Sequence, residues 1–210
     1  MQKIMFNERY GLQSAVFEGK KTQTRREPFF SDVEIETNFD IIEIGKFFVI
    51  EKETRKVIHT SRYAVGEIVA VAQSYSDIFD EADNDYFNDI YSNFRNAYVT
   101  ESKGWKNKMF VRADLMPHHI KILDIRCERL QDISARDCIF EGIKCYYEPK
   151  NDWFNMPNKK QSSFSFLDKS KEHFFSSAKE AFCGLIGKLN GKKFWDTNPY
   201  VIVYEFEKID

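Results

Sequence analysis

Residues 17–26 read FEGKKTQTRR and gather one glycine, two lysines, two threonines and two arginines at one junction of the chain. Upstream, residues 7–19 have a helical pattern, in which Asn7 suits the N-cap and Gly19 suits the left-handed position after the last turn. Downstream, residues 21–26 alternate like an extended segment. We therefore expect this stretch to leave a helix and enter a strand.

The rest of the chain predicts a strand-rich core with helices packed on it. Alternating or short apolar runs predict strands at 3–6, 65–75, 120–130 and 200–207 and a hairpin over 41–63. Capping boxes, Ser134 with Asp137 and Ser177 with Glu180, predict helices over 133–143 and 176–191. The second helix is expected to bury Phe182, Leu185, Ile186 and Leu189. These elements predict an α+β fold, a small mixed or closed β-barrel with packed helices.

Length and charge limit the organisation and the partners. The 210 residues fit one domain, with insertions expected at about 76–108, which is acidic and aromatic, and at 146–172, which is polar. The net charge is -2, whereas proteins that bind long nucleic acids carry a basic excess to neutralise phosphates. A nucleic-acid partner is therefore expected to be a nucleotide, a nucleoside or a short single-stranded segment.

Cysteine, histidine and apolar patterns predict neither a metal nor a membrane. The four cysteines show no CxxC spacing and are expected to be reduced thiols in a cytoplasmic protein. His118 and His119 are adjacent at the start of a predicted strand, so their side chains point to opposite faces and do not chelate together. The longest apolar runs are the length of a strand, and no signal peptide is predicted. We expect no cofactor.

The landmarks of the chain resemble a known family. FEGKKTQTRR, VGEIVAVAQSY, ERLQDIS followed by EGI, and WDTNPYVIVYEFE occur in the order seen in the ASCH family of the PUA-like superfamily, in particular its phage- and prophage-associated members. The family signature Gly-x-Lys-x-x-(Glu/Thr)-x-Arg is matched by Gly19, Lys21, Thr24 and Arg26. The resemblance covers residues 3–75, 107–145 and 177–207, and it implies a PUA-like β-barrel with a cleft that binds RNA or nucleotide-like ligands.

A bacterial branch that is similar at the signature hydrolyses N4-acetylcytidine, and its catalytic set maps onto Lys21, Thr24 and Glu141 of this chain. Lys21 needs a lowered pKa to act as a base, Thr24 is a nucleophile or an oxyanion donor, and Glu141 is a proton shuttle. On an extended segment Lys21 and Gln23 share a face that Thr24 does not, so a twist is needed before Lys21 and Thr24 converge. The structural alternatives are a solvated lysine, a strand threonine and a helix-end glutamate.

The expected ligand contacts lie on three segments. Arg25 and Arg26 offer planar forks for phosphate or carboxylate, and we expect one to pair with an acid and the other to face the cleft. Relatives carry Arg-Glu where this chain has Ala72-Gln73, and a Trp where it has Tyr75. The further candidates, with core packing as the alternative for the tryptophan, are Gln73, Tyr75, Trp195 and Asn198.

Three hypotheses about function follow. The first is a ligand-binding module that recognises RNA, a nucleotide or a modified nucleoside. The second is an amidohydrolase that cleaves an N-acylated cytosine-type nucleoside with Lys21, Thr24 and Glu141. The third is a phage accessory protein that binds a host protein through its insertions. The sequence leaves the oligomeric state undetermined.

Overall fold

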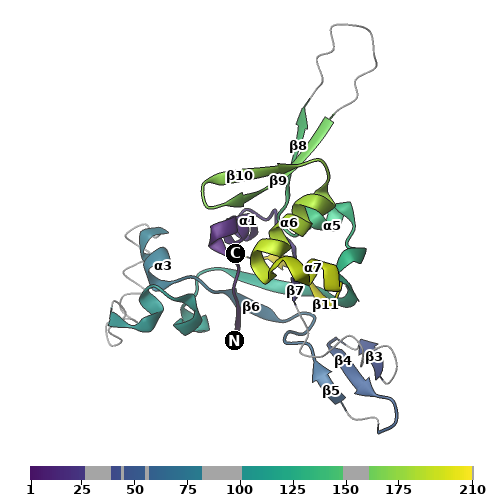
Figure 1. Ribbon diagram of the computed structural model, residues 1–210. Helices are drawn as coiled ribbons and strands as arrows, with labels where there is room; N and C mark the ends of the chain where they lie inside the picture. The colour runs from purple at the N-terminus through teal and green to yellow at the C-terminus, as the bar shows by residue number, and fades with distance from the viewer. Residues whose placement is uncertain (27–38, 44, 55–56, 82–100, 149–160, 210) are drawn as a thin grey trace, which may run out of the picture. The chain divides into compact units, whose positions relative to one another are not determined.

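The computed structural model is an α+β protein and describes residues 1–26, 39–43, 45–54, 57–81, 101–148 and 161–209 (Figure 1). Its strands are β1 (Gln2–Ile4), β2 (Gln23–Arg26), β3 (Phe39–Glu43), β4 (Phe47–Glu51), β5 (Val57–Thr60), β6 (Ile68–Val71), β7 (His119–Arg129), β8 (Lys144–Glu148), β9 (Gln161–Asp168), β10 (Lys171–Phe175) and β11 (Tyr200–Lys208). Its α-helices are α1 (Leu12–Phe17), α3 (Tyr75–Glu81), α5 (Ala135–Phe140), α6 (Ala178–Asn190) and α7 (Lys192–Thr197). Short 3-10 helices are η1 (Glu8–Tyr10), η3 (Lys103–Trp105), η4 (Lys108–Phe110), η5 (Ala113–Leu115) and η6 (Leu130–Asp132).

The described strands form a five-stranded sheet, in the order β1-β6-β7-β11-β2, and two three-stranded sheets, β10-β9-β8 and β3-β4-β5. Strands β1 and β2 are the edges of the large sheet, so its described part is open and the predicted closed barrel is not seen there. The mixed α+β class is confirmed.

The chain divides into two compact units. Unit 1 comprises Met1–Phe6, Glu67–Lys121 and Glu207–Asp210, and unit 2 comprises Asn7–Gly66 and Ile122–Phe206. Strands β7 and β11 contribute residues to both units. The single domain with two insertions stays a prediction.

Unit 1 is built on an apolar cluster beside paired strands. β1 runs parallel to β6, and β6 runs antiparallel to the start of β7. The Lys3 ammonium donates to the backbone carbonyls of Met109 (2.7 Å) and Val111 (2.6 Å), which fixes η4 and the residue after it to β1. The buried cluster consists of Ala70, Ala72, Tyr75, Ile78, Val111 and Met116.

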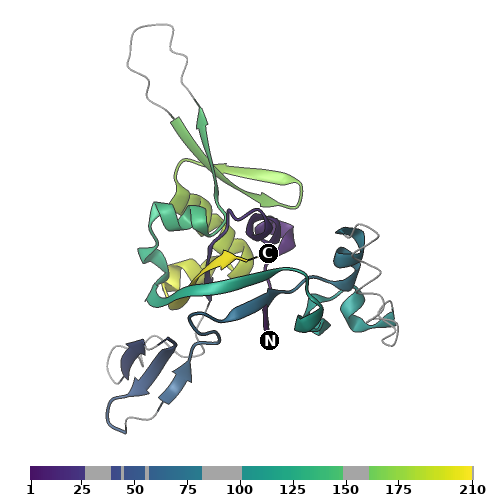
Figure 2. The same cartoon turned by 180° about the vertical axis from the view of Figure 1, so that it is seen from behind.

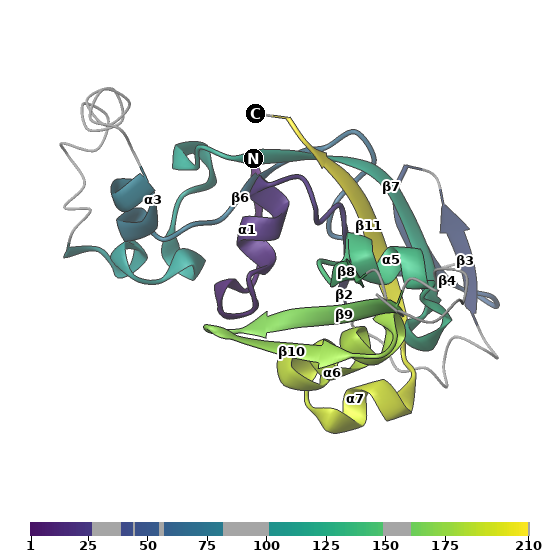
Figure 3. The same cartoon turned by 90° about the horizontal axis from the view of Figure 1, so that it is seen from above.

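Unit 2 packs helices against antiparallel strands. β2 pairs with β11, and the sheet of β8, β9 and β10, drawn in green, is antiparallel throughout (Figure 2). α6 lies against β9 and β10 (Figure 3), where Phe166 and Phe175 approach Gly184. Phe182 and Leu185 on the same helix are also buried, because an amphipathic helix turns its apolar stripe to the core.

Most of the predicted elements are confirmed. Ser134 and Ser177 cap α5 and α6 by accepting hydrogen bonds from the backbone of Asp137 and Glu180, as their capping boxes predict. The predicted hairpin over 41–63 contains β4 paired with β5, and the predicted strands over 120–130 and 200–207 correspond to β7 and β11.

Three details differ from the sequence analysis. The helix predicted over 7–19 is interrupted at Gly11, whose φ of 68° lies in the left-handed region and separates η1 from α1. Leu189 is exposed because it lies in the last turn of α6, beyond the buried residues of that helix. The strand predicted over 65–75 ends at Val71, and Tyr75 begins α3 instead.

The predicted insertions are described only in part. The segments 82–100 and 149–160 lie outside the described residues. Within the remainder, α3 and η3 lie in the first insertion, whereas the end of β8, β9 and the start of β10 lie in the second. No helix in the described part of the chain is long and apolar enough to cross a membrane.

Candidate functional site

The backbone brings the signature lysine to the end of α5. After α1, Gly19 takes a φ of 67°, and the backbone amides of Lys20 and Lys21 both donate to the carbonyl of Ala15 (2.8 and 2.9 Å). The amide of Thr22 then donates to the carbonyl of Phe140, the last residue of α5, at 2.9 Å. This local path explains why Lys21 meets a glutamate 120 positions later in the chain.

Lys21 and Glu141 form a buried ion pair. The Lys21 Nζ donates to Glu141 Oε2 at 2.6 Å, to the Glu141 carbonyl at 2.8 Å and to the Gln23 carbonyl at 2.7 Å. Lys21 is 2% exposed and Glu141 is 5% exposed. Burial lowers the pKa of Lys21 because the charged form loses its hydration, while Glu141 opposes this change.

Arg25 joins the pair from β2. Its Nη1 donates to Glu141 Oε1 at 3.0 Å, and its Nε and Nη2 donate to Glu128 Oε1 at 2.9 and 2.6 Å. Burial acts to lower the pKa of Arg25, but Glu141 and Glu128 outweigh it and raise the pKa further above its ordinary value. Arg25 therefore pairs with acids, as expected for one of the two arginines after the signature lysine.

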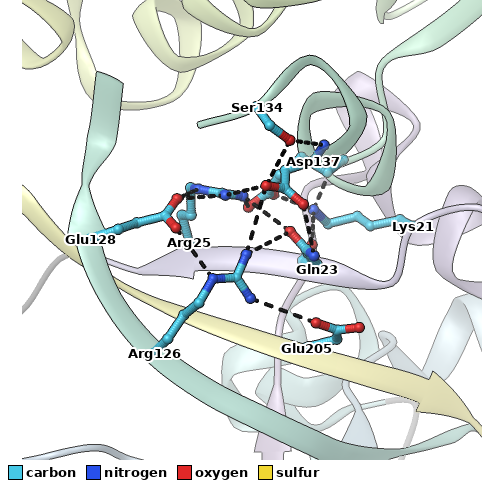
Figure 4. A network of polar contacts seen from close by, with 9 residues as sticks. Lys21, Gln23, Arg25, Arg126, Glu128, Ser134, Asp137 and Glu205 are labelled. Carbon is cyan, nitrogen blue, oxygen red and sulfur yellow. Dashed lines mark hydrogen bonds and ion pairs between the residues drawn. The ribbon is translucent and has the colours of Figure 1, made fainter. Parts of the chain in front are cut away.

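A less buried rim surrounds this pair (Figure 4). Arg126 on β7 contacts Glu128 Oε2 at 3.2 Å, Asp137 Oδ2 at 3.8 Å and Glu205 Oε2 at 3.6 Å. The Gln23 amide nitrogen donates to Asp137 Oδ1 at 3.1 Å. The residues of the rim thus come from β7, α5 and β11, and buried Gln23 on β2 connects to them.

The pKa of Asp137 reflects its position between a helix cap and this rim. Partial burial acts to raise it, but hydrogen bonds from Ser134 and Gln23, together with Arg25 and Arg126, outweigh burial and hold the pKa below its usual range. The adjacent, fully buried Cys138 thiol has a pKa raised to about 12, mainly by burial. The Asp137 carboxylate therefore stays ionised and the thiol stays protonated at neutral pH.

Thr24 and Arg26 lie on the other face of β2. In the β2–β11 ladder Thr24 is opposite Tyr204 and Arg26 is opposite Ile202, whereas Gln23 is opposite Glu205. Because neighbouring side chains of a strand alternate between faces, Thr24 points away from the face that carries Gln23 and Arg25. The structure thus joins two of the three predicted catalytic residues, Lys21 and Glu141, and places Thr24 opposite buried Tyr204.

Trp195 and Asn198 hold the segment before β11. The Trp195 ring packs edge-on against Phe182, with centroids 6.2 Å apart. Asn198 ends α7 with a φ of 45°, and its side-chain oxygen accepts from the Gln131 amide at 2.8 Å. The Gln131 side chain in turn donates to the Trp195 carbonyl at 2.7 Å. Both predicted contact residues thus make structural interactions within unit 2.

Gln73 and Tyr75 belong to unit 1. Gln73 is fully buried, and its backbone amide donates to Met116 Sδ at 3.3 Å. Tyr75 lies in the apolar cluster, and its hydroxyl accepts from the Arg112 amide at 3.0 Å. Both residues therefore contribute to the core of a different compact unit from the one that holds Lys21 and Glu141.

Sequence reasoning missed Arg126, Glu128 and Glu205. A signal is present, because Arg126 and Glu128 are spaced by two on a strand, as Gln23 and Arg25 are, and such side chains share one face. Asp137 is predicted only as a capping residue, although its carboxylate also accepts from Gln23. Among the described residues, no group of three His, Cys, Asp or Glu side chains is placed to hold a metal ion.

In comparisons with protein-family models, with curated proteins and with solved structures, the chain has no significant match.

Proposed function

We propose that the protein is a nucleic-acid-related ligand-binding module with a PUA-like (ASCH) fold, and that it recognises a nucleotide, a modified nucleoside or a short RNA. The observation that carries the proposal is the buried Lys21–Glu141 pair with Arg25 on its second oxygen. Buried ion pairs are seldom more stabilising than apolar residues of similar volume. A buried cluster with perturbed pKa values is therefore a candidate for binding or chemistry.

The charge of the rim favours the nucleoside part of such a ligand. In the rim a single arginine, Arg126, contacts four carboxylates, Asp124, Glu128, Asp137 and Glu205. A surplus of carboxylate repels phosphates but accepts hydrogen bonds from amino and ring N–H groups of a base. A base or nucleoside thus suits the rim better than a chain of phosphates.

Equilibrium binding tests the proposal. Titration calorimetry with cytidine, N4-acetylcytidine and a short single-stranded RNA should give saturable binding that Lys21→Ala weakens by tenfold or more, about 1.4 kcal/mol. Lys20→Ala is the matched control, because the Lys20 side chain is 73% exposed and pairs with its near neighbour Glu18. Binding that is equal in Lys21→Ala and the parent protein would contradict the proposal.

The 2.6 Å contact between Lys21 and Glu141 favours a second candidate, an amidohydrolase acting on an N-acylated cytosine-type nucleoside. Water would attack the acyl carbon, the carbon–nitrogen bond would break, and the nucleoside amine and a carboxylic acid would leave. Burial makes neutral Lys21 easier to reach, so that it can accept a proton, and Glu141 can pass a proton to the leaving amine. Thr24 takes part only if the ligand reaches both faces of β2.

Turnover separates the candidates. The enzyme is selected if the protein releases cytidine from N4-acetylcytidine, if Lys21→Ala abolishes this release and if Lys20→Ala retains it. The Thr24→Val variant would then show whether the threonine takes part in the reaction. Saturable binding without release would select the module. If the protein neither binds nucleosides nor releases cytidine, the third hypothesis is favoured. In that hypothesis a phage accessory protein docks onto a host protein through segments which include 82–100 and 149–160.

A further inference from the structure

We infer that Arg25, which lies between the fixed positions of the signature, is a positioning residue that fixes the Glu141 carboxylate against the Lys21 ammonium. The inference rests on the proposed function, in which Lys21 and Glu141 act on the bound ligand. In this role Arg25 does not contact the ligand, because it acts through Glu141.

The two oxygens of Glu141 are divided between two cations. Oε2 accepts from Lys21 Nζ at 2.6 Å, and Oε1 accepts from Arg25 Nη1 at 3.0 Å. A carboxylate held at both oxygens cannot rotate about its last bond without breaking a charged hydrogen bond, and such bonds are about twice as strong as neutral ones. Arg25 therefore determines which way Glu141 presents the oxygen that faces Lys21.

Arg25 is itself held in place. Its side chain is 1% exposed, and its Nε and Nη2 both donate to Glu128 Oε1. Its guanidinium carbon lies 5.9 Å from the centre of the Phe182 ring, within the range of a cation–π contact. The β2–β11 ladder places Arg25 opposite fully buried Val203. The fork is thus fixed by a strand, an acid and an aromatic ring.

The negative charge of Glu141 is shared between Lys21 and Arg25. Glu141 neutralises Arg25 as well as Lys21, and the charges of Arg26 and, to a smaller extent, Arg25 act to lower the pKa of Lys21 beyond the effect of burial. The charged groups around the pair are Arg25 and Arg26 on β2, Glu141 and Asp137 at α5, Glu128 and Arg126 on β7, Glu205 on β11 and Lys179 on α6. Arg25 is bonded directly to the carboxylate that accepts from Lys21.

Two substitutions separate charge from shape. Arg25→Gln removes the charge and keeps a hydrogen-bonding amide. The negative charge of Glu141 then stabilises the Lys21 ammonium without competition from Arg25, so Lys21 should release its proton at higher pH. Arg25→Lys keeps the charge but loses the fork that spans Glu128 and Glu141. In Arg25→Lys the titration of Lys21 should stay close to that of the parent protein.

The experiment follows the Lys21 signal by NMR in the full chain labelled with 13C at the lysine ε position, with the signal assigned by its loss in Lys21→Arg. Across a pH series, the Arg25→Gln midpoint should move to higher pH than that of the parent and of Arg25→Lys. An unchanged midpoint in Arg25→Gln would overturn the inference. If Arg25→Gln does not fold, Glu128→Gln, which changes a partly exposed acid, should move the midpoint the opposite way because Arg25 then draws more on Glu141, and no movement would overturn the inference.

Nucleoside binding in the same proteins separates the two proposals. Arg25→Gln should weaken binding at pH 7 by about tenfold or more, since a buried charged hydrogen bond is lost. If the parent protein binds no nucleoside but Arg25→Gln moves the Lys21 midpoint, the proposed function fails and the role of Arg25 stands. If nucleosides bind and the midpoint is unchanged, the proposed function stands and the role of Arg25 fails.

Discussion

The two compact units differ in the charged side chains that they bury. Unit 1 buries an apolar cluster around Tyr75, whose hydroxyl is satisfied by a backbone amide. Unit 2 has an apolar core as well, which includes Phe182 and Leu185, but it also buries Lys21, Arg25 and Glu141 as a charged group. An apolar core is stabilised by close packing and tolerates changes in pH, whereas a charged one depends on each partner being present and correctly ionised. The difference indicates that unit 2 has kept an arrangement which stability alone does not require.

Removing the central carboxylate should have the largest effect. Glu141→Gln leaves Lys21 and Arg25 buried with a neutral partner, and breaking a buried pair in this way costs about 3–5 kcal/mol. Urea unfolding at pH 7 measures the change. Glu205→Gln is the matched control, since the Glu205 side chain is 41% exposed and its loss should cost less than about 1 kcal/mol. Equal losses of unfolding free energy in the two variants would show that burial does not strengthen the ion pairs of Glu141.

The apolar core of unit 1 should respond to added volume. A methyl group at Gly104 would lie 2.5 Å from Tyr75 Cε2 and 3.3 Å from the Phe110 carbonyl oxygen, so Gly104→Ala should destabilise by about 1–3 kcal/mol. Urea unfolding gives the loss, and hydrogen exchange of the amides around Val111 and Met116 locates it. In a Tyr75→Leu background the same change should cost less, and an undiminished cost there would count against overpacking as the cause.

The sequence predicts best those features of the fold that depend on residues close together in the chain. Helix starts depend on neighbouring residues, so the sequence correctly identifies Ser134 and Ser177 as caps. Ser74 and Asp77 form the same motif at the start of α3, with reciprocal hydrogen bonds, but the acidic composition there favours an insertion and hides the motif. The interruption at Gly11 depends on a single left-handed residue that periodicity does not reveal.

The candidate site is predictable only in part. The resemblance suggests Lys21, Thr24 and Glu141 together, but strand alternation separates Thr24 from the other two, as the extended spacing of the signature predicts. The Arg25–Glu128 contact joins β2 to β7, and a pairing over 103 positions has no local signal. Such contacts are set by the order of strands in the sheet, which the sequence does not specify.

A pH series should distinguish the cores further. Burial raises the pKa of Cys138 to about 12 from 9.0, so below pH 9 the thiol is protonated in both the folded and the unfolded protein. Above pH 9 only the unfolded chain loses the proton, and stability falls by about 1.4 kcal/mol per pH unit until the folded pKa is reached.

The unfolding free energy of the parent and of Cys138→Ala, measured between about pH 8 and pH 10.5, isolates this effect. Lys21, whose pKa is lowered, contributes with the opposite sign over part of the range and is present in both proteins. The difference between the two proteins should therefore shrink as pH rises above 9. A difference that stays constant across the range would mean that the thiol is hydrated in the folded protein.

The smallest effect should come from a site in unit 2 that involves neither charge nor tight packing. Gly187 lies inside α6 with open space where an added methyl group would lie, so Gly187→Ala should stabilise by about 0.5–1 kcal/mol through helix propensity alone. Gly184 on the same helix is the contrast, because a methyl group there would lie 2.9 Å from Phe175 Cζ and 3.1 Å from Phe166 Cε1. The midpoint of thermal unfolding should therefore rise for Gly187→Ala and fall for Gly184→Ala. If both variants lose stability, α6 is sensitive to added volume along its whole length and not only where Gly184 faces Phe166 and Phe175.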